Sequence, residues 1–202
     1  MSNAPHQLRL LLRKQLRQKR RELSDFTQQQ NSIALNLNLL KLFDTIETTN
    51  IKIAVYLAND GEINLTPFIE PAWQENFILF LPVLDPNNKN FLVFLPYIDN
   101  RKLIKNKFGI KEPLYNKAEC YHAQDMDIIL MPLVGFDRNG NRLGMGGGFY
   151  DRSLDFMKHK KAEKPILIGV AHDIQELDKI PVENWDIPLN YLITNKEIIK
   201  FS

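Results

Sequence analysis

The sequence predicts an α/β fold with a mostly parallel sheet that helices cover on both faces. The first observation is the apolar run from Asp127 to Val134, which suits a strand buried on both faces better than an amphipathic helix. The second is that strand-like runs alternate with segments of helical spacing along the chain. The length of 202 residues fits one domain with a substantial core. We expect a single domain over residues 1–202, with residues 1–23 as a basic helix packed on it.

The two N-terminal helices follow from residue spacing. Leucines keep helical spacing between His6 and Leu23, which predicts the first helix. Ser24 is the expected cap of a second helix that runs to about Ile46. We expect that helix to pack through the stripe formed by Ile33, Leu37, Leu40 and Phe43.

The rest of the chain alternates between strands and helices. A helix is expected over Leu65–Trp73, and another begins after Gly148 with Phe149, Tyr150, Leu154 and Met157 at helical spacing. The expected strands are Ile51–Leu57, Phe77–Leu81, Phe91–Tyr97, Asp127–Val134, Pro165–Ala171 and Tyr191–Thr194. Residues 82–90 read as a polar, hairpin-like link, and residues 98–120 as a structured loop.

Composition and charge limit the classes of function. The net charge of +2 is close to neutral, so the chain as a whole does not call for nucleic acid or an anionic membrane. No apolar stretch has the length of a membrane span, and the N-terminus has no apolar signal core. The single cysteine, Cys120, has no internal disulfide partner, which fits a reducing compartment. We expect a cytoplasmic monomer.

A glycine-rich loop follows the apolar strand and is the main functional signal. It holds six of the nine glycines of the chain, namely Gly135, Gly140, Gly144, Gly146, Gly147 and Gly148. Free backbone amides in such a loop and at the start of the following helix can surround an anion, and a phosphate is the obvious guest. The alternative is a glycine-rich surface turn without a ligand. The loop does not match the P-loop signature. It does not match the dinucleotide fingerprint either, because Phe149 stands where that fingerprint needs glycine.

Charged side chains near this loop suit a phosphate. Arg142 is a planar, permanently charged donor that can grip phosphoryl oxygens in pairs. Asp151, in the first turn of the following helix, is either a cap acid or a metal ligand.

The N-terminal helix is locally basic, with seven Lys and Arg residues between Arg9 and Arg21. Arg9 and Arg13 are four residues apart and project from the same face, so both could reach one polyphosphate. We assign Lys14, Arg17, Lys19 and Arg21 to a solvated basic face. Nucleic-acid binding through this local patch is a second alternative.

The roles of three groups of residues remain open from the residues alone. The turn Asn59-Asp60-Gly61 delivers Glu62 just beyond the end of a strand, where it either contacts a ligand or complements the dipole of the next helix. His172 and Asp173 follow another strand and are either catalytic or ordinary loop residues. Trp73, Tyr97 and Phe108 either pack in the core or stack on a flat ring.

The run from Gly135 to Arg152 resembles the signature of the 5-formyltetrahydrofolate cyclo-ligase family, also called 5,10-methenyltetrahydrofolate synthetase. Further segments are similar to family landmarks in the same order: Arg9, Arg13 and Arg20, the turn Tyr56–Glu62, the segment Phe108–Pro113 and the segment Pro181–Asp186. The resemblance covers nearly the whole chain. It implies a single three-layer α/β/α domain.

The resemblance also implies the activity. The substrate is 5-formyltetrahydrofolate, with or without a polyglutamate tail, and ATP is the co-substrate. Transfer of the γ-phosphoryl group to the formyl oxygen, attack by N10 and loss of phosphate give 5,10-methenyltetrahydrofolate with ADP. Phosphoryl transfer depends on positioning and charge neutralisation, and the sequence supplies groups for both.

The resemblance assigns residues to these roles. The catalytic pair is Arg142 and Glu62. The residues implied for ATP are Arg9, Arg13, Arg142, Leu143, Gly144, Met145, Gly146, Gly147, Gly148, Phe149 and Tyr150. The residues implied for the folate are Leu57, Glu62, Met145, Gly146, Gly147, Gly148 and Phe149. Asp151 and Asp186 are implied to hold Mg²⁺, a hard cation that takes a few carboxylates together with phosphate oxygens.

Two positions depart from the family pattern. Phe149 stands where many relatives have tyrosine, and Gly147 stands where some carry lysine, so Arg142 bears more of the phosphate charge. Two rival functions are a noncatalytic nucleotide- or RNA-binding module and a sugar-phosphate isomerase or coenzyme A transferase on a related scaffold.

Overall fold

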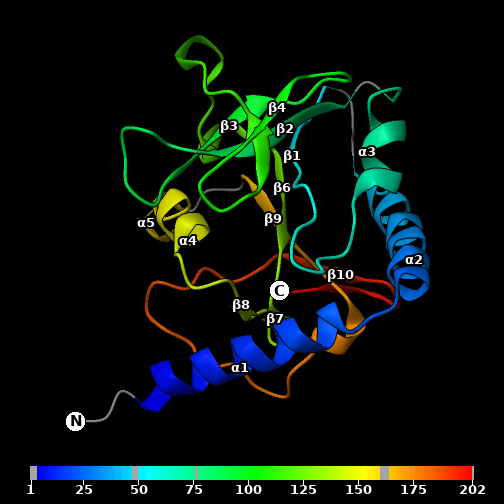
Figure 1. Cartoon of the computed structure of the whole chain (residues 1–202), viewed down its shortest axis with the longest axis vertical. Helices are drawn as coiled ribbons and strands as arrows, with labels where there is room; N and C mark the ends of the chain where they lie inside the picture. The colour runs from blue at the N-terminus through cyan, green and yellow to red at the C-terminus, as the bar shows by residue number, and fades with distance from the viewer. Residues whose placement is uncertain (1–3, 47–49, 76, 160–163, 202) are drawn as a thin grey trace.

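The centre of the structure is a seven-stranded sheet with the strand order β11-β10-β9-β6-β1-β2-β3 (Figure 1). This computed structural model describes residues 4–46, 50–75, 77–159 and 164–201. The sheet consists of β1 (Lys52–Ala54), β2 (Ile78–Leu84), β3 (Leu92–Pro96), β6 (Ile128–Pro132), β9 (Ile166–Ala171), β10 (Tyr191–Thr194) and β11 (Ile198–Lys200). The neighbouring strands from β10 to β2 run parallel, and the two edge strands are antiparallel. The expected α/β class with a mostly parallel sheet is confirmed.

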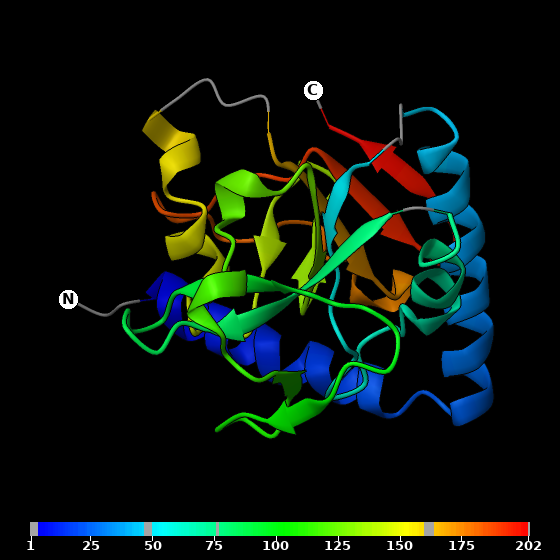
Figure 2. The ribbon, with the colours of Figure 1, turned by 90° about the horizontal axis from the view of Figure 1, so that it is seen from above.

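Helices lie on both sides of the sheet (Figures 1 and 2). The α-helices are α1 (Ala4–Arg21), α2 (Asp25–Phe43), α3 (Thr66–Ala72), α4 (Phe149–Ser153) and α5 (Phe156–His159). α2 and α3 lie on one side, and α4 and α5 lie on the other. α1 crosses one end of the molecule and runs into α2 through a short connection capped by Ser24, whose side chain accepts a hydrogen bond from the Thr27 amide.

Short elements complete the chain. The hairpins are β4 (Leu103–Lys105) with β5 (Lys111–Pro113) and β7 (Gly135–Phe136) with β8 (Arg142–Leu143). Three 3-10 turns lie at Lys117–Glu119, Ala123–Asp125 and Asp173–Gln175. No helix in the described ranges has both the length and the apolarity needed to cross a membrane.

The central strands bury both faces, which is why their sequences lack polar alternation. Ile128 and Leu130 of β6 belong to the core cluster that includes α2 and α3. Ile129 and Met131 point to the opposite face and join a second cluster with Leu154. A parallel strand between two helical layers therefore reads as a continuous apolar run.

The expected packing face of α2 is wrong except at Phe43, which is buried in the core. Ile33, Leu37 and Leu40 are exposed, and the face that contacts the sheet contains Leu35, Leu39, Leu42 and Phe43. Both stripes have helical spacing, so spacing alone does not choose between them. The buried stripe also contains two polar residues that the pattern disfavoured: Ser32 bonds the carbonyl of Gln28, and Asn38 bonds the carbonyl of Thr194.

Several expected boundaries also differ. β1 ends at Ala54, three residues before the expected end, and β2 runs on to Leu84 to pair with β3 in a hairpin. The expected loop at residues 98–120 contains the β4–β5 hairpin. The helix expected after Gly148 is split into α4 and α5. These segments are short, and cross-strand pairing or packing decided their conformation over local pattern.

The difference between the expected and the observed packing face of α2 can be tested by measuring stability. Leu35 is 0% exposed and Leu37 is 54% exposed. We expect Leu35→Ala to lower the free energy of unfolding by about 2 to 5 kcal/mol, because it leaves a cavity in a packed core. Leu37→Ala should change it by less than about 0.5 kcal/mol. Urea unfolding of both variants measures the difference, and equal losses would contradict the packing of α2.

Candidate functional site

A cavity of about 740 Å³ lies between α1, the loop after β1, the β4–β5 hairpin and the glycine-rich loop. The loop after β1 and the residues at the end of β6 follow parallel neighbouring strands, so both reach the same edge of the sheet. This is the edge at which open α/β sheets bind their ligands.

The cavity brings together almost all the site residues expected from the sequence. Those that line it are Arg9, Arg13, Leu57, Glu62, Arg142, Gly144, Met145, Gly146, Gly147, Gly148, Phe149, Tyr150, Asp151 and Asp186. Leu143 is the exception within the described residues. The whole residue is 0% exposed and packs with Leu16, Val134 and Ile180. Its carbonyl accepts a hydrogen bond from the Val134 amide, so Leu143 is not available to a ligand.

Gly135 and Gly140 of the glycine-rich loop lie within the β7–β8 hairpin, and residues 144–148 connect this hairpin to α4. Gly148 occupies the N-cap position of α4 with a φ of 67°, a conformation that side chains other than glycine rarely adopt. Arg152 donates a hydrogen bond to the carbonyl of Gly147 at 2.7 Å, which closes the loop onto the helix. α4 is only five residues long, so its dipole contributes less to an anion site than the longer helix expected from the sequence.

Arg142 is the strongest sign of an anion site. It is 7% exposed, and its Nη2 donates to the Oδ1 of Asp151 at 2.5 Å. Its Nη1 is enclosed and has no hydrogen-bond partner among the described residues. Burial lowers the pKa of Arg142, and the charges of Asp151 and Asp186 oppose that effect. A buried donor of a charged group needs an acceptor, which a phosphoryl oxygen would supply.

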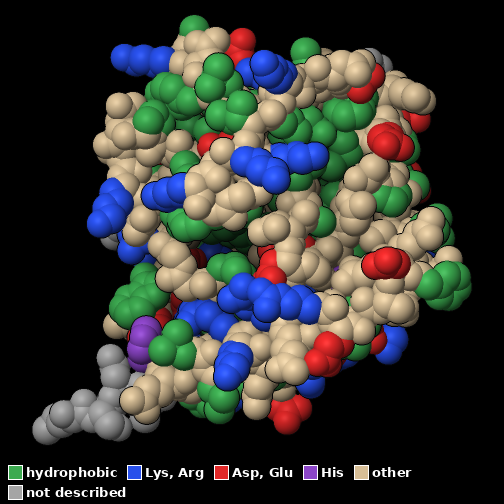
Figure 3. All heavy atoms as spheres, in the orientation of Figure 1, with side chains coloured by type: hydrophobic (Ala, Val, Ile, Leu, Met, Phe, Trp, Pro, Cys, Tyr) green, Lys and Arg blue, Asp and Glu red, His purple; other side chains and the backbone are tan. Residues whose placement is uncertain are grey.

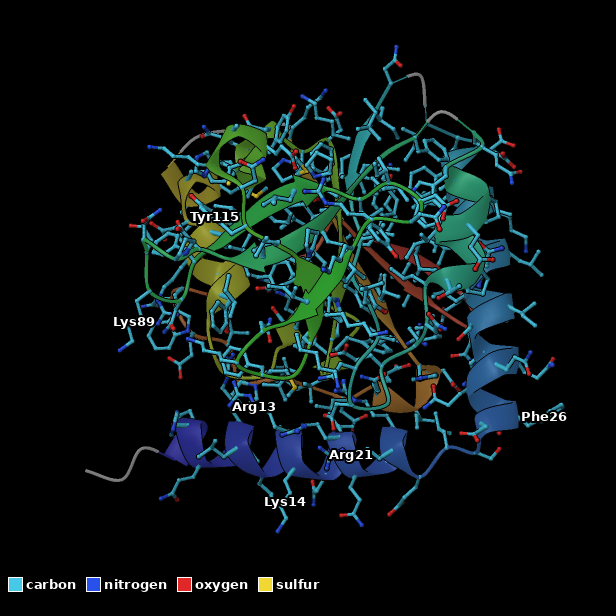
Figure 4. All side chains as sticks on the ribbon, turned by 45° about the horizontal axis from the view of Figure 1, so that its top comes forward. Arg13, Lys14, Arg21, Phe26, Lys89 and Tyr115 are labelled. Atoms are coloured by element: carbon cyan, nitrogen blue, oxygen red, sulfur yellow. The ribbon has the colours of Figure 1, made fainter. Side chains whose placement is uncertain are left out.

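Arg9 and Arg13 approach the same place from α1. Arg9 donates through Nη1 to the Oδ2 of Asp186 at 2.5 Å and to the carbonyl of Pro181 at 2.8 Å. Arg13 donates through Nε to the carbonyl of Gly144 at 2.8 Å. Figure 4 shows Arg13 on the side of α1 that faces the body of the protein and Lys14 on the opposite side. Burial first, and then the nearby charge of Arg9, lower the pKa of Arg13.

The expected solvated face is confirmed for Lys14, Lys19 and Arg21, which are exposed, whereas Arg17 is half-buried. Arg17 pairs with Asp60 at 2.7 Å, and Arg21 pairs with the same carboxylate. Asp60 accepts a further hydrogen bond from Arg20. These three arginines oppose the effect of burial and lower the pKa of Asp60. In the space-filling view, Lys and Arg side chains gather along α1 where it meets the body, with acidic side chains beside them (Figure 3).

Arg20 was not assigned a role from the sequence, although it joins three parts of the site. It is 0% exposed and donates to the carbonyls of Asp60 and Leu133, at 2.8 and 2.9 Å. Its Nη2 lies 3.6 Å from the Oε1 of Glu62. Gly61 sits directly against the end of α1, where an added Cβ would come within 3.0 Å of the Arg20 carbonyl oxygen. No local pattern distinguishes Arg20, among the seven basic residues of α1, as the one that is 0% exposed.

Glu62 has an unusual protonation equilibrium. Its Oε2 accepts the Asn59 amide at 3.0 Å. Burial raises its pKa from 4.5 to about 7, against the opposing charge of Arg20. The charge of Glu62 in turn raises the pKa of Tyr150, after burial, and Arg142 acts on Tyr150 in the opposite direction. Glu62, Tyr150 and Arg142 therefore share one end of the cavity.

The β4–β5 hairpin supplies a wall of the cavity that the sequence reading left unassigned. Asn106, Phe108, Ile110, Lys111 and Glu112 line it. The ring of Phe108 meets that of Phe149 edge to face, with centroids 5.8 Å apart. Trp73 and Tyr97 instead pack on each other and on the core, 5.2 Å between centroids. Of these three aromatic residues, only Phe108 is therefore placed to stack on a ligand ring. The sequence signal for this role was its place in a segment that resembles a family landmark.

His172 and Asp173 do not line the cavity. His172 is buried, its Nδ1 lies 3.0 Å from the Asn31 side-chain nitrogen, and burial lowers its pKa to about 4. Asp173 pairs with Lys196 and accepts a hydrogen bond from Asn195. Both fit the ordinary structural alternative.

The donor set fits a metal bound together with a nucleotide. Asp151 and Asp186 both line the cavity, each beside an arginine. No group of three or more His, Cys, Asp or Glu side chains suited to a metal occurs in the described part of the chain. Two carboxylates completed by phosphate oxygens match the preference of Mg²⁺, whereas a cage built only from protein is not present among these residues.

Comparison with known proteins shows the family of the chain. The model of the 5-formyltetrahydrofolate cyclo-ligase family matches residues 5–195. The 5-formyltetrahydrofolate cyclo-ligase of Haemophilus influenzae is 38% identical, over 91% of this chain and 95% of its own length. The Escherichia coli K12 enzyme of that name is 38% identical, over 72% of this chain and 79% of its own length.

A solved structure leads to the same family. The NMR structure of Aquifex aeolicus 5,10-methenyltetrahydrofolate synthetase superimposes with a TM-score of 0.77 at 30% identity, covering 96% of this chain and 92% of that one. Sequence, fold and cavity together place the chain in the 5-formyltetrahydrofolate cyclo-ligase family.

Proposed function

We propose that this protein converts 5-formyltetrahydrofolate to 5,10-methenyltetrahydrofolate in a reaction that needs ATP and Mg²⁺ and releases ADP and phosphate. Membership in the family supports the folate substrate. The observation that carries the nucleotide part is the enclosed Nη1 of Arg142, a charged donor without a partner among the described residues, at a cavity bordered by the glycine-rich loop.

The chemistry requires an activated formyl oxygen. The oxygen of the N5-formyl group attacks the γ-phosphorus of ATP, the bond from that phosphorus to the β,γ-bridging oxygen breaks, and ADP leaves. The N10 amine then attacks the formyl carbon and loses its proton. Cleavage of the carbon–oxygen bond releases phosphate and leaves the cyclic methenyl cation.

The nucleotide end of the cavity serves the first step. Arg142, the backbone from Gly144 to Tyr150 and the two helix residues Arg9 and Arg13 would hold the phosphates. Charged donors that are fixed before the reaction stabilise developing negative charge without reorganisation. Because Arg142 and Arg9 already pair with Asp151 and Asp186, they are held in place before a ligand arrives.

Asp151 and Asp186 are the residues that would hold Mg²⁺. The ion would neutralise phosphate charge, a role that phosphoryl transfer commonly requires. The rest of the catalysis falls to the side chains of this chain, which orient ATP and folate and exclude water.

The folate would occupy the other part of the cavity. Leu57 offers an apolar contact, and the segment from Met145 to Phe149 lies between the two substrates. Glu62, with a pKa of about 7, can accept a hydrogen bond or a proton from the folate near neutral pH. The charge of Glu62 raises the pKa of Tyr150, on which Arg142 also acts, and this supports a place for Glu62 near the reacting end.

The rival nucleic-acid reading loses its main support. Arg17, Arg20 and Arg21 are engaged by Asp60, and Arg9 by Asp186. An outward basic stripe of the kind that grips a polyanion therefore contains fewer cations than the sequence suggested.

We further propose that the enzyme acts as a monomer in the cytoplasm.

Removal of Arg142 tests the phosphate role. We expect Arg142→Ala to lower turnover by about 100- to 1,000-fold, the cost of losing a donor to developing charge. The assay mixes protein, Mg²⁺ and 5-formyltetrahydrofolate, adds ATP and follows the near-ultraviolet absorbance of methenyltetrahydrofolate. Arg138→Ala is the matched control, because Arg138 belongs to the same β7–β8 hairpin but is exposed and pairs with Glu176 and Glu197. Full turnover by folded Arg142→Ala would refute the assignment.

The pH dependence of folate binding tests Glu62. A ligand that donates to a carboxylate prefers its charged form, and Glu62 with a pKa of about 7 is protonated below that pH. We expect the affinity for 5-formyltetrahydrofolate to fall as pH is lowered through 7, by up to about tenfold per pH unit, and to level off above it. Calorimetric titration without ATP between pH 6 and 8 measures this. Glu62→Gln should bind more weakly with a flat profile, whereas a flat wild-type profile would exclude the role.

Substitution of the two aspartates tests the metal site. We expect ATP to bind more tightly to the wild type in the presence of Mg²⁺, and we expect Asp151→Asn and Asp186→Asn to reduce this enhancement about tenfold or more. Titrations of ATP with and without Mg²⁺ give the two dissociation constants needed for each protein. Asp178→Asn, an exposed substitution nearby in sequence, serves as the control. An undiminished Mg²⁺ effect in both variants would place the metal elsewhere.

A further inference from the structure

Glu112 is a buried carboxylate on the cavity wall with no function in the proposed reaction. It lies in β5, is 8% exposed and lines the cavity beside Leu84 and Leu92. Pairing of Leu84 with Leu92 in the β2–β3 hairpin places both side chains in one wall. The surroundings of the carboxylate are therefore mainly apolar.

The hydrogen bonds of Glu112 reach only one of its two carboxylate oxygens. The Asn106 side-chain amide donates to Oε2 at 2.8 Å, and the Leu84 amide donates to the same atom at 3.4 Å. Oε1 has no partner among the described residues, and it is not one of the enclosed unpaired atoms. It is thus the oxygen that remains open to the cavity.

Glu112 also has no counterion in the part of the chain that the structure describes. Burial raises its pKa, and the groups that oppose this are the neutral Asn106 and the Leu84 amide. Glu62 differs, because Arg20 lies 3.6 Å from its Oε1. Burial of a carboxylate without a cation costs free energy unless hydrogen-bond donors reach it. A buried carboxylate on a cavity wall therefore indicates a ligand that supplies such donors.

The shape of this end of the cavity limits the ligand. Leu84, Leu92 and Ile110 present apolar surface, and Phe108 presents a ring. A flat ring with N–H donors on one edge suits such a wall, because apolar side chains can face its plane and Glu112 can accept from its edge. A phosphate does not suit it, since the nearby Glu112 would repel an anion. In 5-formyltetrahydrofolate, the pteridine ring offers N3–H and the 2-amino group side by side.

We propose that Oε1 of Glu112 accepts a hydrogen bond from the N3–H and 2-amino edge of the pteridine and so determines the specificity for the folate ring. This inference rests on the proposed function, since it takes the folate as the occupant. Glu112 then holds the ring at one end of the cavity while Glu62 lies at the reacting end, next to Tyr150 and Arg142.

The test compares two ligands and two proteins. One ligand is 5-formyltetrahydrofolate, and the other is its analogue with methyl in place of the 2-amino group. The wild type should bind the analogue about 10- to 100-fold more weakly, as expected for loss of a hydrogen bond to a charged group. Glu112→Ala removes the acceptor and should bind both ligands with nearly equal affinity. Calorimetry gives all four dissociation constants.

Two controls separate this role from a structural one. Glu119→Gln, at an exposed glutamate that pairs with Arg101, should keep the wild-type discrimination. ATP affinity and the urea midpoint of Glu112→Ala show whether the fold and the nucleotide end survive. If Glu112→Ala weakens both folate ligands equally, Glu112 only supports the hairpin and the proposal is overturned. If the wild type binds 5-formyltetrahydrofolate but does not discriminate, this proposal alone fails. Absence of any binding to the wild type overturns the proposed function as well.

Discussion

The ion pair between Arg20 and Asp60 holds the site together. Arg20 is 0% exposed, and a guanidinium that has lost its water must find other partners for its donors. It finds them on the loop after β1, through the Asp60 carboxylate and carbonyl, and at the end of β6, through the Leu133 carbonyl. One side chain thus fixes α1 against two neighbouring strands of the sheet. Removal of Asp60 would take the hydrogen-bonded carboxylate from the buried Arg20, and breaking a buried pair in this way typically costs about 3 to 5 kcal/mol. Removal of Arg20 would leave Asp60 paired with Arg17 and Arg21.

The consequence for function is that both ends of the cavity share one support. α1 carries Arg9 and Arg13 toward the glycine-rich loop, and through Arg20 it also holds the turn that presents Glu62. The charges in the cavity are already balanced in pairs, Arg9 with Asp186 and Arg142 with Asp151. For the proposed nucleotide, these groups would be oriented before it binds, and such preorganisation is the main source of electrostatic catalysis. Glu112 is different because no cation pairs with it among the described residues, and the ligand that we propose for this wall brings neutral donors.

Local pattern predicted the elements well where one signal dominated. The buried strands β6, β9 and β10 were found because two-sided burial leaves a continuous apolar run. The cap of α2 at Ser24 was found because its hydroxyl has a defined partner within three residues. The packed face of α2 was missed because two stripes compete, and Ser32 and Asn38 are buried only through bonds to distant or preceding backbone. The β4–β5 hairpin was missed because its strands are three residues each and are defined by their pairing.

The sequence by itself determined the α/β class, the glycine-rich loop and the residue types that surround it, since these depend on short-range periodicity and on a family signature. Only the tertiary structure decided which of seven basic residues on α1 turn inward, that Glu62 has a pKa of about 7, and that Glu112 faces the cavity. The physical reason is that burial, charge pairing and the loss of water are properties of groups far apart in the chain. They exist only once α1, the hairpin and the edge of the sheet have come together.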